Sequence, residues 1–178
     1  MKRESAAYGY TGMNIITGIV LAVVIAVVMV ITLTGCTEPE LNIEVSPPPG
    51  FMVEGAATND NFITYSNENG TSLTITLKNM EADNLEKAAD GVFARIQSAY
   101  VDVERIGEVT DTKVDSFPAK TFEVKGLFEE DRSPFRANLV IVKNNTGNYT
   151  VIQYFADEDL YDGEIAYFYL FLANVQFK

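Results

Sequence analysis

A single hydrophobic segment near the N-terminus constrains this chain more than any other feature. From Ile15 to Ile31 nearly every residue is Val, Ile, Leu, Met or Ala, and the run is preceded by Lys2 and Arg3. A basic start followed by an apolar stretch is typical of a secretory signal. A run of about 17–19 such residues is also close to the length of a transmembrane helix. Both interpretations place Lys2 and Arg3 on the cytoplasmic side of the membrane and residues 37–178 on the outer side.

The hydrophobic run is followed by Leu33-Thr34-Gly35-Cys36, which resembles the bacterial lipobox. In a lipobox the cysteine thiol receives a diacylglyceryl group, and small residues before it let the signal peptidase reach the backbone. We therefore predict that residues 1–35 are a lipoprotein signal peptide, with an uncleaved membrane anchor as the alternative. Cys36, the only cysteine, is the predicted lipid-attachment site. The protein is expected at the extracytoplasmic face of the cell membrane, lipid-anchored.

The composition excludes or weakens several kinds of chemistry. The chain of 178 residues has no His and one Cys. Without His there is no Ser-His-Asp or Cys-His couple and no His-ligated zinc, and one Cys forms no intramolecular disulfide or multi-Cys zinc site. The 25 acidic and 13 basic side chains give a net charge of −12, which disfavours nucleic acid as a partner. No GxSxG or SxxK motif is present. We therefore predict a non-catalytic protein without a cofactor.

A short spacer is predicted between the lipid-attachment site and a folded domain. Residues 36–49 end in Pro47-Pro48-Pro49, and consecutive prolines favour the extended polyproline II conformation. We expect this spacer to hold the domain, residues 50–178, away from the bilayer.

The first half of the domain is predicted to contain a β-hairpin and then a helix. Apolar and polar residues alternate on both sides of the turn signal Asn67-Glu68-Asn69-Gly70, so residues 61–78 are expected to form a hairpin. Asp83 or Asn84 then occupies a helix N-cap position. From Leu85 to Tyr100 the apolar residues recur with helical spacing, which predicts a helix with one buried face.

Strand signals dominate the next part of the domain. Three apolar segments bounded by turn signals are predicted strands: residues 119–126, 136–143 and 149–156. The last two are expected to pair as a hairpin. Residues 101–114 are ambiguous, with a short strand around Ile106 and Val109 as one interpretation.

The chain ends in an apolar segment that is too short to span a membrane. Residues 165–172 contain only Ile, Ala, Tyr, Phe and Leu, and the acidic segment 157–162 precedes them. We predict a buried C-terminal helix with an acidic cap, followed by a short strand at 175–177. A run of strands with helices at its ends predicts an α+β fold, an antiparallel β-sheet flanked by helices.

Two clusters of side chains are candidate ligand sites, each with a structural alternative. Asp157-Glu158-Asp159, with Asp162 and Glu164, either binds Ca²⁺ or forms a solvated acidic helix cap; no DxDxDG loop is present. Glu129-Glu130-Asp131 is interpreted as a charged turn. Aromatic residues crowd the last 25 positions: Tyr154, Phe155, Tyr161, Tyr167, Phe168, Tyr169 and Phe171. They either line a groove for a hydrophobic ligand or partner, or fill the core beneath the last helix.

The order of these segments resembles PsbP-like domains of the DcrB/PsbP type. The resemblance covers residues 47–178, from Pro49-Gly50-Phe51 through Phe117-Pro118-Ala119-Lys120-Thr121-Phe122 to Val175-Gln176-Phe177. It implies an antiparallel sheet flanked by helices, and a binding or accessory module attached to a larger assembly. It carries over no catalytic or metal-binding residue.

These observations combine into one expected function and one alternative. We expect a membrane-anchored cell-envelope lipoprotein whose non-catalytic domain supports a membrane protein partner. The alternative is a small-ligand or cation-binding envelope protein. The expected partners are the membrane, through the lipid anchor or the N-terminal helix, and an unidentified envelope protein.

Overall fold

The computed structural model of the chain describes residues 43–56, 62–78, 80, 82–144 and 148–178. The hydrophobic run and Cys36 lie outside these residues, so the signal peptide and the lipid-attachment site stay predictions. Among the residues that the structure describes, no helix is both long and apolar enough to cross a bilayer.

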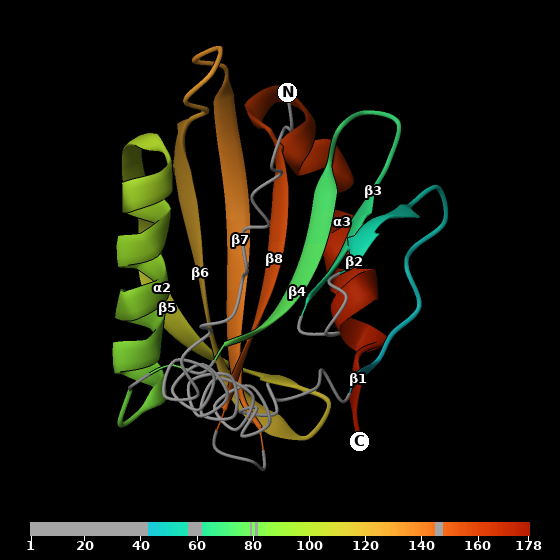
Figure 1. Ribbon diagram of the computed structural model, residues 1–178, viewed down its shortest axis with the longest axis vertical. Coiled ribbons are helices and arrows are strands. Elements are labelled where there is room, and N and C mark those ends of the chain that lie inside the picture. The colour runs from blue at the N-terminus through green and yellow to red at the C-terminus, as the bar shows by residue number, and fades with distance from the viewer. Residues whose placement is uncertain (1–42, 57–61, 79, 81, 145–147) are drawn as a thin grey trace, which may run out of the picture. The chain divides into compact units, whose positions relative to one another are not determined.

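A seven-stranded antiparallel sheet forms the centre of the domain (Figure 1). Its strands lie side by side in the order β2-β3-β4-β8-β7-β6-β5. Their bounds are β2 (Met52–Ala56), β3 (Phe62–Ser66), β4 (Ser72–Lys78), β5 (Val101–Val114), β6 (Phe117–Leu127), β7 (Pro134–Lys143) and β8 (Tyr149–Asp157). The pairing of β4 with β8 joins the first three strands to the last four, so the sheet is continuous.

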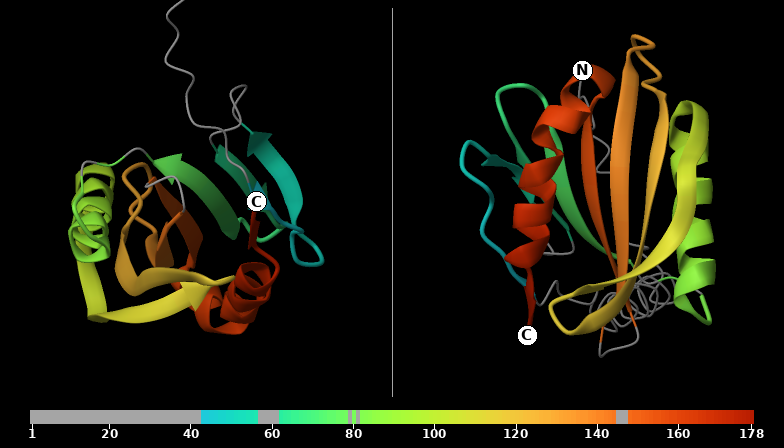
Figure 2. Two further views of the ribbon diagram at one scale, coloured as in Figure 1. Left: turned by 90° about the horizontal axis from the view of Figure 1, so that it is seen from below. Right: turned by 180° about the vertical axis from the view of Figure 1, so that it is seen from behind.

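Two helices pack on opposite faces of this sheet (Figures 1 and 2). α2 (Leu85–Ala99) contacts β5, β6 and β7, whereas α3 (Glu158–Ala173) contacts β7 and β8. The alternation of side chains along β7 divides the core: Leu139 and Ile141 pack on the α2 side, and Val140 and Val142 pack on the α3 side. The predicted α+β class, an antiparallel sheet flanked by helices, is confirmed.

The first predicted helix forms where its sequence signals place it. The side chain of Asn84 is the N-cap and accepts a hydrogen bond from the backbone N–H of Lys87 at 2.9 Å. The buried residues then follow with helical spacing: Ala88, Ala89, Val92 and Ile96. The predicted hairpin over residues 61–78 is also present, as β3 and β4.

β5 is much longer than the short strand expected within residues 101–114. It spans the whole segment, but its pairing with β6 shifts register between Val101 and Glu104 and again between Ile106 and Thr110. Asp102 and Gly107, at φ +51° and +75°, lie within these irregular stretches. Each bulge adds an unpaired residue and interrupts the two-residue alternation. The strand was therefore not recognisable as one continuous pattern.

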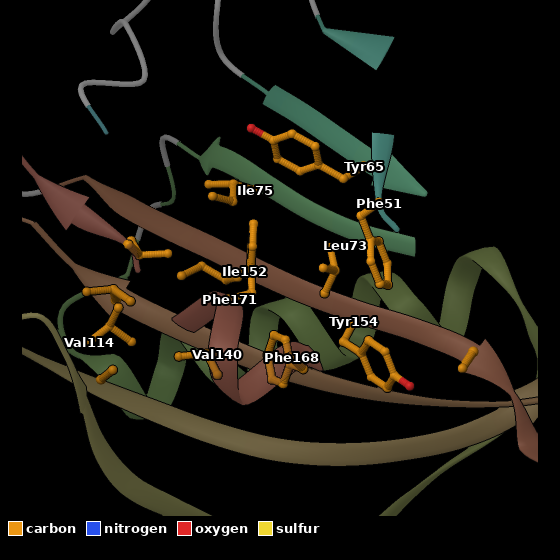
Figure 3. Close-up of a cluster of buried hydrophobic side chains, with 14 of the residues drawn as sticks. Phe51, Tyr65, Leu73, Ile75, Val114, Val140, Ile152, Tyr154, Phe168 and Phe171 are labelled. Atoms are coloured by element: carbon orange, nitrogen blue, oxygen red, sulfur yellow. The ribbon is translucent and has the colours of Figure 1, made fainter. Parts of the chain in front are cut away.

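Most of the C-terminal aromatic residues fill the core between α3 and the sheet. Figure 3 shows Tyr154, Phe168 and Phe171 among the aliphatic side chains of β4, β7 and β8. The rings of Tyr154 and Phe168 are stacked with their centroids 5.6 Å apart, and Phe171 meets Tyr65 edge-on at 5.8 Å. Tyr161 is buried as well, whereas Tyr169 is 56% exposed. The core interpretation therefore holds for the buried part of this cluster.

A small second sheet brings the two ends of the described chain together. β1 (Ile43–Glu44) pairs antiparallel with β9 (Gln176–Phe177). Ile43 packs against the core on the α3 side, and Pro48 is buried, with its carbonyl accepting a hydrogen bond from the Phe51 N–H at 3.2 Å. The C-terminal part of the predicted spacer 36–49 thus packs on the domain.

Candidate functional site

One half of the sheet face on the α2 side carries no helix among the described residues. α2 contacts β5, β6 and β7, whereas β3, β4 and the adjoining part of β8 extend beyond it (Figure 2). The uncovered strands present small polar side chains in register. Thr64 lies opposite Thr74, and Thr74 lies opposite Gln153. This face is therefore rich in hydroxyl and amide groups.

A pocket of about 400 Å³ lies where the uncovered face meets the covered half. We call it the trough, and it is lined by Glu54, Gly70, Ser72, Thr74, Tyr100, Phe128, Gln153, Phe155, Ala156 and Asp157. β4 and β8 provide most of the floor. Tyr100, which caps α2, Phe128, which follows β6, and Phe155 on β8 form an aromatic wall. Its volume lies within the range of about 300–1,000 Å³ that is usual for ligand sites.

The aromatic wall of the trough is held by a cluster of four rings. The ring of Tyr100 lies 5.6 Å from that of Phe155 and 5.9 Å from that of Phe128, measured between centroids. Phe135 is fully buried behind them, 5.4 Å from Phe155 and 4.9 Å from Tyr100. Burial raises the pKa of Tyr100 further above neutral pH, and its hydroxyl is protonated there. The wall offers apolar contact together with a phenolic hydroxyl.

Charge in the trough is entirely acidic. Glu54 and Asp157 line it, and its lining contains no Lys, Arg or His. Ser72 and Thr74 provide hydroxyl groups, but no imidazole or amine is beside them to activate a nucleophile. The trough can accept hydrogen bonds, stack on an apolar group and attract a positive charge. These are properties of a binding site.

The acidic segment at the start of α3 is not arranged as a cation site. α3 begins at Glu158, earlier than the predicted helix at 165–172, and the helical turn places Glu164 on a different side of the helix from Glu158 and Asp162. Asp162 binds Arg136, and Glu164 binds the turn between β3 and β4. In the described part of the chain, no three acidic side chains are gathered where they could hold a metal ion. The Ca²⁺ interpretation is therefore not supported.

The carboxylate of Glu164 clamps the turn that borders the trough. Asn67 Nδ2 donates to its Oε2 at 2.9 Å, Asn69 Nδ2 donates to its Oε1 at 2.6 Å, and the Thr71 hydroxyl also donates to Oε2. Partial burial works to raise the pKa of Glu164, but the three hydrogen bonds outweigh it and hold this pKa below its usual value. No local sequence signal marks this contact, because its members lie 93–97 residues apart.

A second polar cluster attaches α3 to the sheet. Arg136 on β7 donates from Nη1 to Asp162 Oδ1 at 2.9 Å and from Nη2 to Glu123 Oε2 at 3.1 Å. Its guanidinium carbon lies 4.0 Å from the ring centroid of Tyr161. Every charge in this cluster is paired within the domain, which indicates a structural role.

The run Glu129-Glu130-Asp131 lies in the turn between β6 and β7, as its composition indicated. Asp131 accepts hydrogen bonds from the Ser133 N–H at 2.9 Å and the Ser133 hydroxyl at 2.7 Å, and these lower its pKa. The run is a local turn.

Comparison with known proteins shows likeness in structure only. No family model matches the sequence, and no curated protein has a significant match to it. Among solved structures, the Ran-binding protein Mog1p of Saccharomyces cerevisiae superimposes with a TM-score of 0.55 at 12% identity, over 78% of this chain and 93% of that one. The cyanobacterial PsbP protein of Synechocystis (CyanoP) gives 0.54 at 14% identity, over 77% of this chain and 87% of that one.

A third structure, a protein of unknown function from Pseudomonas aeruginosa described as a putative regulator, gives a TM-score of 0.53 at 7% identity, over 78% of this chain and 84% of that one. Identities this low relate the chains by fold and say nothing of shared ligands. The seven-stranded antiparallel sheet with its two helices nevertheless agrees with the fold that the resemblance to PsbP-like domains implied. The described domain of this protein has the Mog1p/PsbP-like fold.

Proposed function

We propose that this protein is a cell-envelope lipoprotein whose domain is non-catalytic and binds a membrane-associated protein through the trough. The observation that carries the proposal is the uncovered, hydroxyl-rich half of the sheet, bounded by the aromatic wall of Tyr100, Phe128 and Phe155. The lipid anchor rests on the hydrophobic run and on Cys36 after it.

The extent of the uncovered face favours a protein as the occupant. Beyond the trough the same face reaches Phe62 and Met52, because Phe62 lies opposite Thr76 and Met52 lies opposite Ser66. Phe62 is 36% exposed and Met52 is 74% exposed. Aromatic and Met side chains are enriched at protein interfaces relative to the rest of the surface.

Electrostatics indicates the chemistry of the partner surface. After Cys36 the chain has 24 acidic and 11 basic residues, and the charged residues of the trough are acidic. Complementary potentials steer association and select partners. We therefore expect the bound segment to carry Lys or Arg beside an apolar side chain that packs on the aromatic wall.

A small ligand is the second candidate, favoured by the pocket volume of about 400 Å³. The acidic lining would select a cationic organic molecule with an apolar part. Native mass spectrometry of the full-length protein extracted in mild detergent distinguishes this candidate, because a small ligand adds a constant mass that disappears after denaturation.

Site-specific photo-crosslinking in intact cells tests the proposed partner. A photoreactive residue replaces Thr74 on the floor of the trough, and in a matched control it replaces the exposed Arg95 on the outer side of α2. We expect a single membrane-protein adduct from position 74 and none from position 95. Loss of that adduct in the Phe155→Asp variant would link it to the aromatic wall. Equal products at both positions, or none at position 74, would contradict the proposal.

The anchor is tested in the same preparations. Mass spectrometry of the N-terminal peptide is expected to show a chain that begins at Cys36 with a diacylglyceryl group. The Cys36→Ser variant should lose both this modification and the adduct from position 74. A native peptide that begins near Met1 would instead show an uncleaved anchor.

A further inference from the structure

The outer surface of α3 changes character along the helix. Its first turns carry Glu158, Asp159 and Asp162, whereas no residue from Ile165 to Phe177 is charged. In this uncharged part, four of the exposed residues follow helical spacing on the side away from the core. We call them the α3 patch: Ala166, Tyr169, Leu170 and Ala173. Tyr169 is 56% exposed and Leu170 is 46% exposed, so the patch presents apolar surface.

The α3 patch lies at the end of the domain from which the chain leads back to Cys36. α3 runs through Val175 into β9, and β9 pairs with β1 through Ile43 and Phe177 (Figures 1 and 2). Seven residue steps separate Cys36 from Ile43. In any conformation those steps span at most about 25 Å, which is less than the thickness of a bilayer core of about 30 Å.

We propose that the α3 patch rests on the headgroup region of the membrane to which Cys36 is attached. This inference rests on the lipid anchor of the proposed function. Because Ile43 and Pro48 pack on the domain, this inference replaces the expectation that the spacer holds the domain away from the bilayer. A short tether keeps this end of the domain at the bilayer, and tyrosine side chains favour the boundary between headgroups and acyl chains. The same orientation lets the acidic start of α3 point away from anionic headgroups, which would repel it.

This orientation is compatible with binding at the trough. α2 and α3 lie on opposite faces of the sheet (Figure 2). Tyr100 and Phe155, which line the trough, belong to the core cluster on the α2 side. A membrane in contact with the α3 patch therefore leaves the trough open. The lipid surface is the occupant that the tether length and the uncharged helix end both favour.

Fluorescence quenching in vesicles tests the contact. The full-length lipidated protein is reconstituted into vesicles of phosphatidylethanolamine and phosphatidylglycerol that contain a headgroup-linked nitroxide quencher. Because the thiol of Cys36 carries the lipid, an introduced cysteine is the only free thiol. A fluorophore is attached to Leu170→Cys or, as the control, to Glu130→Cys in the exposed turn between β6 and β7, which lies at the opposite end of the sheet (Figure 1).

We expect several-fold stronger quenching at position 170 than at position 130. The Tyr169→Glu change should abolish the quenching of a label at Ala166→Cys without moving the midpoint of thermal unfolding, because Tyr169 is more than half exposed. Equal quenching at positions 170 and 130, or none at 170, in protein that floats with the vesicles would overturn this inference and leave the anchor standing.

Flotation of the vesicles distinguishes a failure of the lipid anchor from a failure of the contact between the α3 patch and lipid. A protein that does not float has no working anchor, and then the lipid contact falls together with that part of the proposed function. A photo-crosslink from position 169 to a protein in cells, without quenching at 170 in vesicles, would overturn the lipid contact and assign the α3 patch to a protein partner.

Discussion

Glu164 of α3 accepts a hydrogen bond from the side chain of Asn67 at 2.9 Å, across 97 positions of sequence. Asn69 and Thr71 of the same turn also donate to this carboxylate. Gly70, within the turn, lines the trough. The contact therefore links the last helix, whose far end carries the α3 patch, to the border of the proposed binding site on the other face of the sheet.

Removing this carboxylate should loosen the turn and destabilise the domain. We expect Glu164→Ala to lower the free energy of unfolding by about 1–3 kcal/mol, because three donors lose a charged acceptor. Chemical denaturation monitored by circular dichroism measures the change. The exposed Glu130→Ala is the control, with an expected change within about 0.5 kcal/mol. Equal stabilities for the two variants would contradict the role given to Glu164.

The same clamp predicts a pH dependence. The folded-state pKa of Glu164 lies below its ordinary value of 4.5, so its stabilising contribution is complete above that value and is lost as the pH falls through the folded pKa. We expect the stability difference between wild type and Glu164→Gln to be constant at neutral pH and to shrink below pH 4.5. Urea denaturation at a series of pH values measures it. A difference that grows towards acid pH would refute the clamp.

Replacement by alanine is expected to have opposite effects on stability at two glycines, Gly126 and Gly163. A Cβ added at Gly126 would lie 3.0 Å from both the ring of Phe135 and the side chain of Val103. We expect Gly126→Ala to cost about 1–3 kcal/mol through overpacking. Gly163 in α3 has open space around it, so Gly163→Ala should stabilise the helix by about 0.5–1 kcal/mol. Thermal unfolding of both variants checks the signs, and a stabilising Gly126→Ala would show that β5 and β6 can separate without cost.

Arg136 makes contacts that a lysine at the same position cannot reproduce. Arg136 binds Glu123 and Asp162 with separate nitrogens and stacks on Tyr161, whereas an ammonium group has no planar fork to do this. We expect Arg136→Lys to lower the free energy of unfolding by about 1–3 kcal/mol. The solvent-exposed pair of Lys87 with Asp83 is the contrast, since Lys87→Ala should cost less than about 1 kcal/mol. A tolerated Arg136→Lys would mean that the stacking on Tyr161 contributes little.

Calcium should leave the stability of the domain unchanged. Two of the acids at the start of α3, Asp162 and Glu164, already have partners in the domain. A ligand that binds only the native state raises its unfolding temperature. We therefore expect the same thermal midpoint for the full-length protein in detergent with Ca²⁺ and with a chelator. A reproducible increase in the thermal midpoint with Ca²⁺, absent in the Asp159→Asn variant, would contradict this expectation and support a cation site at the start of α3.

The elements that were predicted correctly carry their signals within a few residues. The turn at Asn67–Gly70, the N-cap Asn84 and the apolar spacing of α2 each satisfy a local requirement of the backbone. Most core residues could be predicted in the same way, because the two-residue alternation along β7 and β8 places each side chain on one face of the sheet or the other. β2 was not predicted. The full length of β5 was not predicted either, because its bulges interrupt the alternation of apolar and polar residues.

The candidate site had almost no sequence signal. Its residues come from β2, the β3–β4 turn, β4 and β8, together with Tyr100 after α2 and Phe128 after β6. They converge because β4 pairs with β8. In the sequence, Phe155 belongs to the C-terminal group of aromatic residues and Asp157 to the acidic cluster, and neither pattern indicates that the two residues share a pocket. Their shared trough follows from strand order, which depends on which apolar faces fit together in the core.

By itself, the sequence determined the anchor prediction, the exclusion of histidine and disulfide chemistry, the α+β class and the faces of α2, because hydrophobic runs, caps and periodicity act over a few residues. Only the tertiary structure decided that Glu164 clamps a distant turn, that Ile43 pairs with Phe177, and that Tyr169 faces outward while Phe168 beside it is buried. The physical reason is that each of these outcomes depends on the packing of α3 against the sheet, and no local segment contains both partners.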